Sequence, residues 1–319
     1  MTMQRVGGIH HVTAIAADAQ ANVDFYAGVL GLRLVKKTVN QDDPFTYHLY
    51  YGDKHGQPGT AMTFFPYPGV AKGQPGTGQV HATAFSVPTG ALERWPTHLE
   101  RHRTTVHAET ERFGYPALQM TDPDGLILEL VGDAADASEP GWPQGPVPAA
   151  DAVRAFSGVR LASRRPEATA LVLTEMLGFA EAASTAEATR YAIEGVERAA
   201  ALELMHDPPR GRDGAGTVHH VAFRVPDDAV QLEVQERLAQ AGLRPTPVID
   251  RSYFRSVYFR EPGGILFEIA TDGPGFSVDE AVETLGGELK LPAAHEPMRE
   301  RIEAHLAPIR VGASEAGGQ

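Results

Sequence analysis

The sequence repeats itself at a nearly fixed distance. VHATAFSVP at residues 80–88 corresponds to VHHVAFRVP at residues 218–226, and DPDGLILEL at 122–130 corresponds to EPGGILFEI at 261–269. The offsets are 138 and 139 residues, so two segments of about fifty-five residues share one plan. Self-similarity of this kind indicates a fold that is assembled from copies of one supersecondary unit.

The same plan recurs more faintly in two further segments. DFYAGVLGLRLV at residues 24–35 resembles LVLTEMLGFAEA at residues 171–182, and both read as a helix closed by a glycine such as Gly31. Runs with strand-like alternation surround these helices, so each copy reads as a strand, a helix and then several strands. We therefore expect four units, at about residues 7–66, 78–132, 155–206 and 217–271.

The segment between the second and third units is rich in Pro, Gly, Ala and Asp, which is typical of a linker. The sequence thus predicts an N-terminal domain with the first two units and a C-terminal domain with the last two. Their expected bounds are residues 1–135 and 151–272, joined by a linker at 136–150 and followed by a tail at 273–319. In the tail, Met298, Ile302 and Leu306 have the spacing of one face of a short amphipathic helix.

Composition restricts both the chemistry and the surroundings of the chain. The net charge is −13, which argues against nucleic-acid and anionic-membrane partners. No apolar run reaches the ~18 residues of a membrane span and no signal pattern opens the chain, so we expect a cytoplasmic protein. Because cysteine is absent, a transition-metal site would have to use His, Asp or Glu.

Two His-His pairs, at residues 10–11 and 219–220, begin equivalent strand-like runs. Successive side chains of a strand point to opposite faces. His219 is therefore expected to pack with Val221 beneath a helix, and His220 to point onto the open face of the sheet. Equivalence between units then predicts that His11 and His220 form the functional pair, and that His10 and His219 pack or support them.

A carboxylate completes this pattern. The hairpin VYFREPGGILFE turns near residues 262–263, which places Tyr258 opposite Glu268, and an acid inside the apolar strand ILFEIA must be paired or metal-bound. Two imidazoles and one carboxylate form the facial triad of Fe(II) oxygenases. The simpler interpretation is that each group is a satisfied polar side chain, since Glu129 occupies the equivalent place in a unit that has Ala82 instead of histidine.

The repeated unit, together with HHVT, HHVAF and GGILFE, resembles the vicinal oxygen chelate superfamily of glyoxalases, bleomycin-resistance proteins and extradiol dioxygenases. The resemblance covers nearly the whole chain and is greatest to hydroquinone-type ring-cleaving dioxygenases, which share YHLYYGD, PGTAMTFFP and the tail pattern GF…DE…LG…L.LP. It implies an α+β fold of four βαβββ modules, paired into two open-barrel domains around a mononuclear metal.

Carried over by position, the resemblance implies the metal ligands His11, His220 and Glu268 and a surrounding catalytic set of His10, Thr13, His219, Arg251 and Tyr258. Arg251 would hold an oxyanion, and Tyr258 and Thr13 would donate hydrogen bonds to substrate or dioxygen. Without the resemblance, Tyr258 reads equally well as an amphipathic strand residue and Arg251 as a solvated loop cation. The other histidines, His48 among them, are expected to be structural or exposed.

Two departures narrow the expected activity. The catechol-cleaving relatives take their first histidine from the third module, where this chain has Gly158 and Val159, and glyoxalases use a fourth protein ligand where it has Thr63. The expected function is therefore ring cleavage of a small hydroquinone-type aromatic by O2, with Fe(II) or alternatively Mn(II). A glyoxalase-like lyase or isomerase and a non-catalytic sequestering protein remain as alternatives, and exposed strand edges favour a homo-oligomer.

Overall fold

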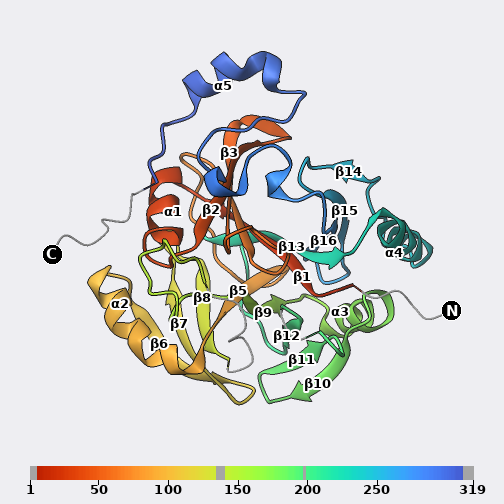
Figure 1. Cartoon of the computed structure of the whole chain (residues 1–319). Coiled ribbons are helices and arrows are strands. Elements are labelled where there is room, and N and C mark those ends of the chain that lie inside the picture. Colours follow the sequence, from red (N-terminus) through yellow and green to blue (C-terminus); the bar gives the residue numbers. More distant parts are fainter. Residues whose placement is uncertain (1–5, 134–140, 197–198, 312–319) are drawn as a thin grey trace.

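The computed structural model describes residues 6–133, 141–196 and 199–311, and within them it shows two curled sheets of eight strands each (Figure 1). The four expected units are present, and each consists of one strand, one helical segment and three strands. The α+β class predicted from the sequence is confirmed.

The first and fourth modules build one sheet. The first contains β1 (Ile9–Ala16), α1 (Ala19–Tyr26), β2 (Arg33–Asn40), β3 (Asp43–Gly52) and β4 (Ala61–Pro66). The fourth contains β13 (Thr217–Val225), α4 (Asp228–Gln240), β14 (Ile249–Asp250), β15 (Arg255–Arg260) and β16 (Leu266–Thr271).

The second and third modules build the other sheet. The second contains β5 (Gln79–Val87), a 3-10 turn that leads into α2 (Trp95–Arg101), β6 (Val106–Arg112), β7 (Tyr115–Thr121) and β8 (Ile127–Gly132). The third contains β9 (Phe156–Ala162), α3 (Pro166–Leu171) with a following π-helical turn, β10 (Ala180–Ser184), β11 (Ala188–Ala192) and β12 (Ala201–Met205).

The way in which the modules pair within the two sheets differs from the order expected from the sequence. The strand orders are β14-β15-β16-β13-β1-β4-β3-β2 and β10-β11-β12-β9-β5-β8-β7-β6. Antiparallel pairing of β1 with β13 joins the first module to the fourth, and pairing of β5 with β9 joins the second to the third. The expected pairing of consecutive modules is therefore wrong, because the predicted segments 1–135 and 151–272 each supply half of both sheets. The boundaries of these segments as domains stay a prediction.

A β-bulge occurs at the same place in all four modules. In the β1–β13 pair, His10 and His219 have no opposite residue, because the register passes from Ile9 to His11 and from His220 to Val218. His81 and Ser157 are skipped in the same way in the β5–β9 pair. A bulge re-aims the side chains around it. Strict alternation therefore fails at the two His-His pairs, and His219 is exposed rather than packed with Val221.

The helices lie on the outside of the two sheets (Figure 1). α1 begins at Asp18, whose carboxylate accepts a hydrogen bond from the Ala21 amide at 2.7 Å. The helix buries Val23 and Tyr26, and the Tyr26 ring lies 4.4 Å from that of Phe64 on β4. Between the two sheets, β13 contacts β5 near the middle of the molecule (Figure 1).

Part of the predicted linker is packed against the first module. The Arg33 guanidinium lies 4.6 Å from the centre of the Trp142 ring, and Val147 is buried. A Cβ at Gly31, whose φ is 72°, would lie only 3.1 Å from a Val147 methyl group. Residues 141–150 are thus part of the packed structure, while residues 136–140 of the predicted linker lie outside the described residues.

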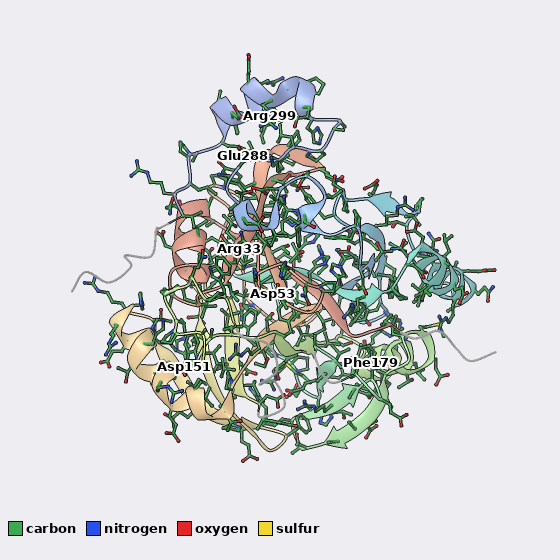
Figure 2. All side chains as sticks on the ribbon, viewed as in Figure 1. Arg33, Asp53, Asp151, Phe179, Glu288 and Arg299 are labelled. Atoms are coloured by element: carbon green, nitrogen blue, oxygen red, sulfur yellow. The ribbon has the colours of Figure 1, made fainter. Side chains whose placement is uncertain are left out.

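The tail returns to the first module, and its predicted helix is confirmed as α5 (Arg299–His305). Ile302 and Leu306 are buried and Met298 packs beside them. Arg299, at the start of α5 (labelled in Figure 2), forms ion pairs with Glu296 at 2.7 Å and Glu303 at 2.9 Å. Residues 312–319 lie outside the described part of the chain.

The helices that the structure describes include none with both the length and the apolar character needed to cross a bilayer.

Candidate metal centre

Three side chains from the first and fourth modules converge on one point. His11 Nε2 lies 3.2 Å from His220 Nε2, and Glu268 Oε2 lies 3.3 Å from the first nitrogen and 2.9 Å from the second. The strand pairing produces this meeting, because β13 lies between β1 and β16 and Ala222 pairs with Glu268. Across residues 6–133, 141–196 and 199–311, no other group of three potential metal ligands comes together in this way.

These three groups fit a divalent metal ion. Two donors about 2.1 Å from a first-row metal and about 90° apart are separated by about 3 Å, close to the three distances observed here. Glu268 Oε2 is buried and has no hydrogen-bond donor among the described residues, and a bound cation would satisfy it. His11, His220 and Glu268 are 2%, 4% and 0% exposed, so their donor atoms are largely withdrawn from water.

The carboxylate is held in its ionised form. Ser256 donates a hydrogen bond of 2.5 Å to Glu268 Oε1, which leaves Oε2 directed at the two imidazoles. Burial by itself would raise the pKa of Glu268, but its interactions with His11 and His220 outweigh burial and hold this pKa well below the ordinary value. An ionised carboxylate is the form that binds a metal ion.

Each predicted histidine ligand is held by the histidine that precedes it. His10 Nδ1 lies 2.9 Å from His11 Nδ1, and His219 Nδ1 lies 2.8 Å from His220 Nδ1. Such contacts between successive residues are made possible by the bulges. They leave Nε2 of His11 and of His220 directed at Glu268, as expected for imidazole ligands whose second nitrogen is engaged elsewhere.

The two supporting histidines are neutral at physiological pH. Burial and the nearby His11 lower the pKa of His10 to about 3, against the opposite effect of a hydrogen bond to the Thr271 backbone. Although His219 is open to a cavity, desolvation by the cavity walls and the neighbouring His220 lower its pKa to about 4. A neutral imidazole has one acceptor nitrogen, so each can accept the Nδ1–H of the ligand beside it.

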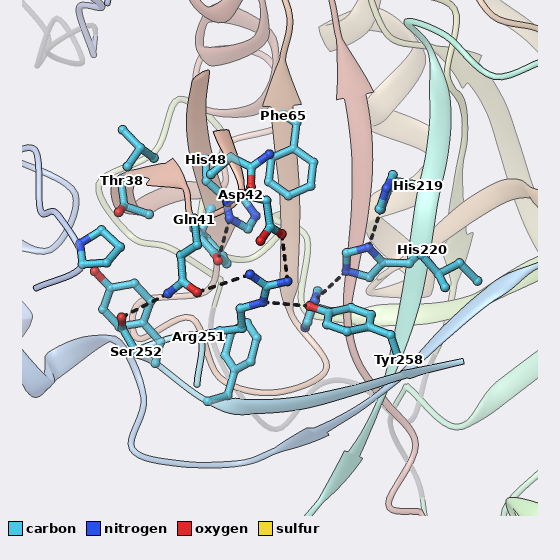
Figure 3. A pocket seen from close by; sticks show the side chains of 18 of the residues that line it. Thr38, Gln41, Asp42, His48, Phe65, His219, His220, Arg251, Ser252 and Tyr258 are labelled. Carbon is cyan, nitrogen blue, oxygen red and sulfur yellow. Dashed lines mark hydrogen bonds and ion pairs between the residues drawn. The ribbon is translucent and has the colours of Figure 1, made fainter. Parts of the chain in front are cut away.

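The centre opens into a cavity of about 420 Å³ whose walls combine aromatic and polar side chains (Figure 3). The aromatic side chains that line it include Tyr50, Phe65, Tyr67, His219, Tyr253, Phe254 and Tyr258. A cavity of this size with aromatic side chains and convergent polar groups is typical of a small-molecule site.

Arg251 crosses this cavity from the fourth module to the first. Its Nε donates to the Tyr258 hydroxyl at 3.3 Å, and its Nη1 donates to Gln41 Oε1 at 3.2 Å. Nη2 forms an ion pair with Asp42 at 3.1 Å (Figure 3). The β2–β3 turn of the first module therefore holds a cation that belongs to the fourth.

The expected catalytic set divides into two groups. His219, Arg251 and Tyr258 line the cavity, as their expected roles require. His10 and Thr13 are buried behind the lining residues, and Thr13 Oγ1 lies 2.8 Å from Thr63 Oγ1. The expectation that Thr13 donates directly to a substrate is therefore not supported by its position.

One residue that the sequence assigned to a structural role lies in the cavity wall. The His48 ring is centred 4.0 Å from that of Tyr50 and 4.3 Å from that of Phe65, and all three line the cavity. The sequence did contain a signal for this position. His48 lies in the YHLYYGD strand two residues before Tyr50, and Tyr50 pairs with Thr63 just as Tyr258 pairs with Glu268.

The second sheet carries ion pairs at the equivalent place. Glu129, the counterpart of Glu268, accepts hydrogen bonds from Arg112 at 2.5 Å and from Gln119 at 3.2 Å. Arg160 lies 3.3 Å from Glu203 on the opposite half. Positive side chains thus occupy the region where the first sheet directs its two imidazoles.

Comparison with known proteins shows which family and which proteins this chain resembles. A family model described as the Glyoxalase/Bleomycin resistance protein/Dioxygenase superfamily matches residues 8–130 and 156–269. "Putative ring-cleaving dioxygenase MhqO" of Bacillus subtilis (strain 168) is 47% identical over 305 residues, which is 95% of this chain and 97% of that protein. The chlorohydroquinone/hydroquinone 1,2-dioxygenase of Sphingobium indicum is 35% identical over 309 residues, which is 94% of this chain and 95% of that protein.

Solved structures agree with the sequence matches. The crystal structure of a dioxygenase described as putative, from Bacillus subtilis, has a TM-score of 0.93 and 46% identity over 97% of this chain and 99% of that one. Glyoxalase I from Zea mays, at 15% identity and a TM-score of 0.61 over 83% of this chain and 92% of that one, shares the fold. The chain therefore belongs to the glyoxalase/bleomycin resistance protein/dioxygenase superfamily.

Proposed function

We propose that this protein is an Fe(II)-dependent dioxygenase that cleaves the ring of hydroquinone-type aromatic compounds. The observation that carries the proposal is the convergence of His11, His220 and Glu268 at the base of an aromatic-lined cavity. A relative named chlorohydroquinone/hydroquinone 1,2-dioxygenase matches over 94% of this chain, which supports the same substrate class.

The metal would be held by His11, His220 and Glu268, and Fe(II) is proposed over Mn(II) because two histidines and one carboxylate are the ligand set of mononuclear iron oxygenases. When bound, such a metal supplies open positions at which a substrate hydroxyl and dioxygen become reactive. His10 and His219 fix the orientation of the two imidazoles, and Ser256 fixes the carboxylate.

Arg251 and Tyr258 are proposed to bind the substrate oxygen as it loses its proton. Burial acts to lower the pKa of Arg251, but Tyr258 and Asp42 outweigh it and raise this pKa, so the guanidinium stays charged. Burial and the charge of Glu268 raise the pKa of Tyr258 well above its ordinary value, so its hydroxyl keeps a proton to donate. A fixed cation and a neutral donor stabilise developing negative charge without reorganisation.

The cavity walls position the ring and exclude water. Phe254 packs 4.9 Å from the ring of the predicted ligand His11, and Phe65 lies 5.8 Å from the ring of the supporting His219, so apolar faces lie on both sides of the centre. An aromatic substrate would gain offset or edge contacts with these rings. Desolvation by the same walls strengthens the interactions of Arg251 and Tyr258 with an anionic oxygen.

The glyoxalase-like alternative is disfavoured by Thr63. This residue pairs with Thr13 as Glu268 pairs with Ala222, so it occupies the place of a second carboxylate ligand in the first module. A threonine hydroxyl is a poor replacement for a carboxylate, because it carries no charge at neutral pH.

Oxygen uptake separates the candidate functions. We expect protein loaded anaerobically with Fe(II) to consume dioxygen when hydroquinones are added, in amounts equal to the ring-opened product formed. Catechols and a methylglyoxal–thiol adduct are the comparison substrates. Consumption of the thiol adduct without oxygen uptake would support the isomerase instead, and binding of hydroquinone by iron-loaded protein without any turnover would support a sequestering protein.

A further inference from the structure

The first and fourth modules approach the candidate metal centre with equivalent strands. Tyr50 on β3 pairs with Thr63 on β4, and Tyr258 on β15 pairs with Glu268 on β16. Since Thr63 is the counterpart of Glu268, Tyr50 is the counterpart of Tyr258. Two tyrosines from related positions therefore flank the centre, and both line the cavity.

The two halves differ in what stands beside these tyrosines. In the fourth module, Ser256 donates to Glu268, which is free to bind a metal through its other oxygen. In the first module, His48 occupies the place of Ser256, and its Nε2 lies 3.0 Å from Thr63 Oγ1. The Tyr50 hydroxyl lies 2.9 Å from His48 Nδ1. A hydrogen-bonded pair, His48 and Tyr50, thus stands beside Thr63, the residue in the place of a second carboxylate.

The Tyr50 hydroxyl has capacity for one further partner. The side chain is 2% exposed, its ring packs against Phe276 and Tyr253, and among the described residues its hydroxyl has one hydrogen-bond partner, His48 Nδ1. A phenol both donates and accepts, so one interaction remains available toward the cavity. Burial raises the pKa of Tyr50 well above its ordinary value, which keeps the phenol neutral.

We propose that Tyr50 is a substrate-binding residue, whose hydroxyl, oriented by His48, hydrogen-bonds an oxygen of the aromatic substrate on the side of the centre where Thr63 replaces a carboxylate. This inference rests on the proposed function. His48 acts through Tyr50 and is a positioning residue. A neutral imidazole accepts a hydrogen bond at one nitrogen and donates one at the other, so Nδ1 of His48 can either accept from the Tyr50 hydroxyl or donate to it. In each case the Thr63 hydroxyl can take the complementary role at Nε2, because a hydroxyl both donates and accepts.

Replacement of Tyr50 by phenylalanine tests the contact. Protein loaded with Fe(II) is titrated with hydroquinone without oxygen, so that binding is measured by calorimetry independently of turnover. We expect Tyr50→Phe to bind hydroquinone about five- to tenfold more weakly, the loss of one neutral hydrogen bond, with unchanged iron content. Tyr51→Phe is the matched control, because the Tyr51 hydroxyl donates to Asn22 and lies outside the cavity lining.

Variants of His48 separate positioning from a purely structural role. His48→Asn keeps an amide near the position of Nδ1 and is expected to retain hydroquinone affinity within about threefold of the unaltered protein. His48→Leu removes the partner of Tyr50 and is expected to match Tyr50→Phe. The double variant His48→Leu/Tyr50→Phe should be no weaker than Tyr50→Phe alone, because both changes remove one interaction.

The outcomes separate this inference from the function on which it rests. Unchanged hydroquinone affinity in Tyr50→Phe, together with normal binding by the unaltered protein, overturns the inference alone. Additive losses in the double variant overturn the role assigned to His48. Failure of the iron-loaded, unaltered protein to bind any dihydroxylated aromatic overturns the proposed function and the inference together.

Discussion

At the scale of single residues, the repeated His-His pair serves two purposes. His11 and His220 direct Nε2 at Glu268, whereas His10 and His219 contact the opposite nitrogen of the same rings. The division of roles follows from the bulges, which bring two successive side chains into contact where a regular strand would separate them. Each member of a pair can therefore be tested separately.

Loss of a predicted ligand should abolish both iron binding and activity. His11→Ala, His220→Ala and Glu268→Gln each remove one of three donors, so iron affinity should fall by more than the 10–100-fold that is typical of losing a supporting residue. Iron per chain is measured by elemental analysis and activity by oxygen uptake. Glu129→Gln, at the equivalent position of the second sheet, is the control and should retain iron. Normal iron content in all three variants would show that the ligands are assigned wrongly.

A supporting histidine should affect iron affinity without being essential for it. His219→Ala leaves His220 in place but removes the partner of its Nδ1, and we expect iron affinity about 10–100-fold lower in a competition with a chelator. His81→Ala is the matched control, because His81 occupies the same bulge in the second sheet, beside Ala82. Equal iron affinities in these two variants would contradict the supporting role.

The residues that sequence reasoning located best are those tied to the repeat. Glu268 was identified from its pairing with Tyr258, which the structure confirms, and His11 and His220 from equivalent positions. His48 was missed because its place beside the cavity is set by a contact with Thr63, which lies on another strand. Thr13 was expected to touch substrate but lies behind the cavity wall. Strand periodicity predicts the face of the sheet on which a side chain lies, but not how deeply that side chain is buried.

At the scale of elements, the turns before the last strands of the second and fourth modules repeat one arrangement, in which Asp122 or its counterpart Glu261 accepts hydrogen bonds from two amides of its own turn. Asp122, at the β7–β8 turn, accepts hydrogen bonds from the amides of Asp124 at 2.9 Å and Leu126 at 2.8 Å. Its other oxygen accepts from the Tyr26 hydroxyl on α1 at 3.1 Å. Burial raises the pKa of this carboxyl from 3.8 to about 6.

This raised pKa predicts how stability varies with pH. The folded state holds the proton of Asp122 more tightly than the unfolded chain does, so the associated stabilisation is complete below pH 3.8 and is lost as the pH rises through about 6. The loss should amount to about 3 kcal/mol of the free energy of unfolding. Asp122→Asn has no proton to release, so the stability of this variant relative to the unaltered protein should increase between pH 4 and pH 7.

Denaturant unfolding at several pH values measures this difference, with the unaltered protein in the same buffers as the control. The amide keeps an oxygen for the two backbone amides and can donate to the Tyr26 hydroxyl, so the variant should remain folded. A stability difference between the two proteins that stays constant from pH 4 to pH 7 would contradict the raised pKa.

Helices were predicted correctly where the residues that indicate them lie close together in the sequence. The helix before Gly31 and the amphipathic helix around Ile302 both formed, since spacing and capping residues lie within a few positions of one another. The bulges were missed, because a skipped residue such as His10 or Ser157 is defined by the register of a partner strand that lies about 70 residues or more away in the sequence. A chain that reads as a regular strand can therefore direct a side chain to the unexpected face.

At the scale of the whole molecule, the candidate metal centre exists because the two ends of the chain meet. His11 comes from the first module and both His220 and Glu268 from the fourth, joined by β1 and β13. The tail reinforces this sheet, since buried Lys36 on β2 binds Asp279 at 2.7 Å and Glu280 at 2.8 Å. The sequence did not predict this pairing because identical module plans are compatible with either order of association.

Dividing the chain should therefore separate the ligands without destroying their ability to reassemble. Fragments 1–136 and 137–319 each carry half of both sheets, so each alone would expose the long unpaired edges of β1 and β5 or of β9 and β13. We expect neither fragment alone to bind iron, because fragment 1–136 holds one predicted ligand and fragment 137–319 holds two. Co-expressed fragments should associate through both sheets and bind about one iron per pair.

Co-purification through a tag on one fragment, followed by elemental analysis, measures both expectations. The matched control carries His220→Ala in fragment 137–319, which should still associate, because the β1–β13 backbone pairing does not depend on this imidazole, but should lose iron. Iron bound by fragment 137–319 alone would show that His220 and Glu268 suffice with another donor. Failure of the fragments to associate, with each folding as a monomer, would show that consecutive modules pair in solution and would contradict the strand order of the two sheets.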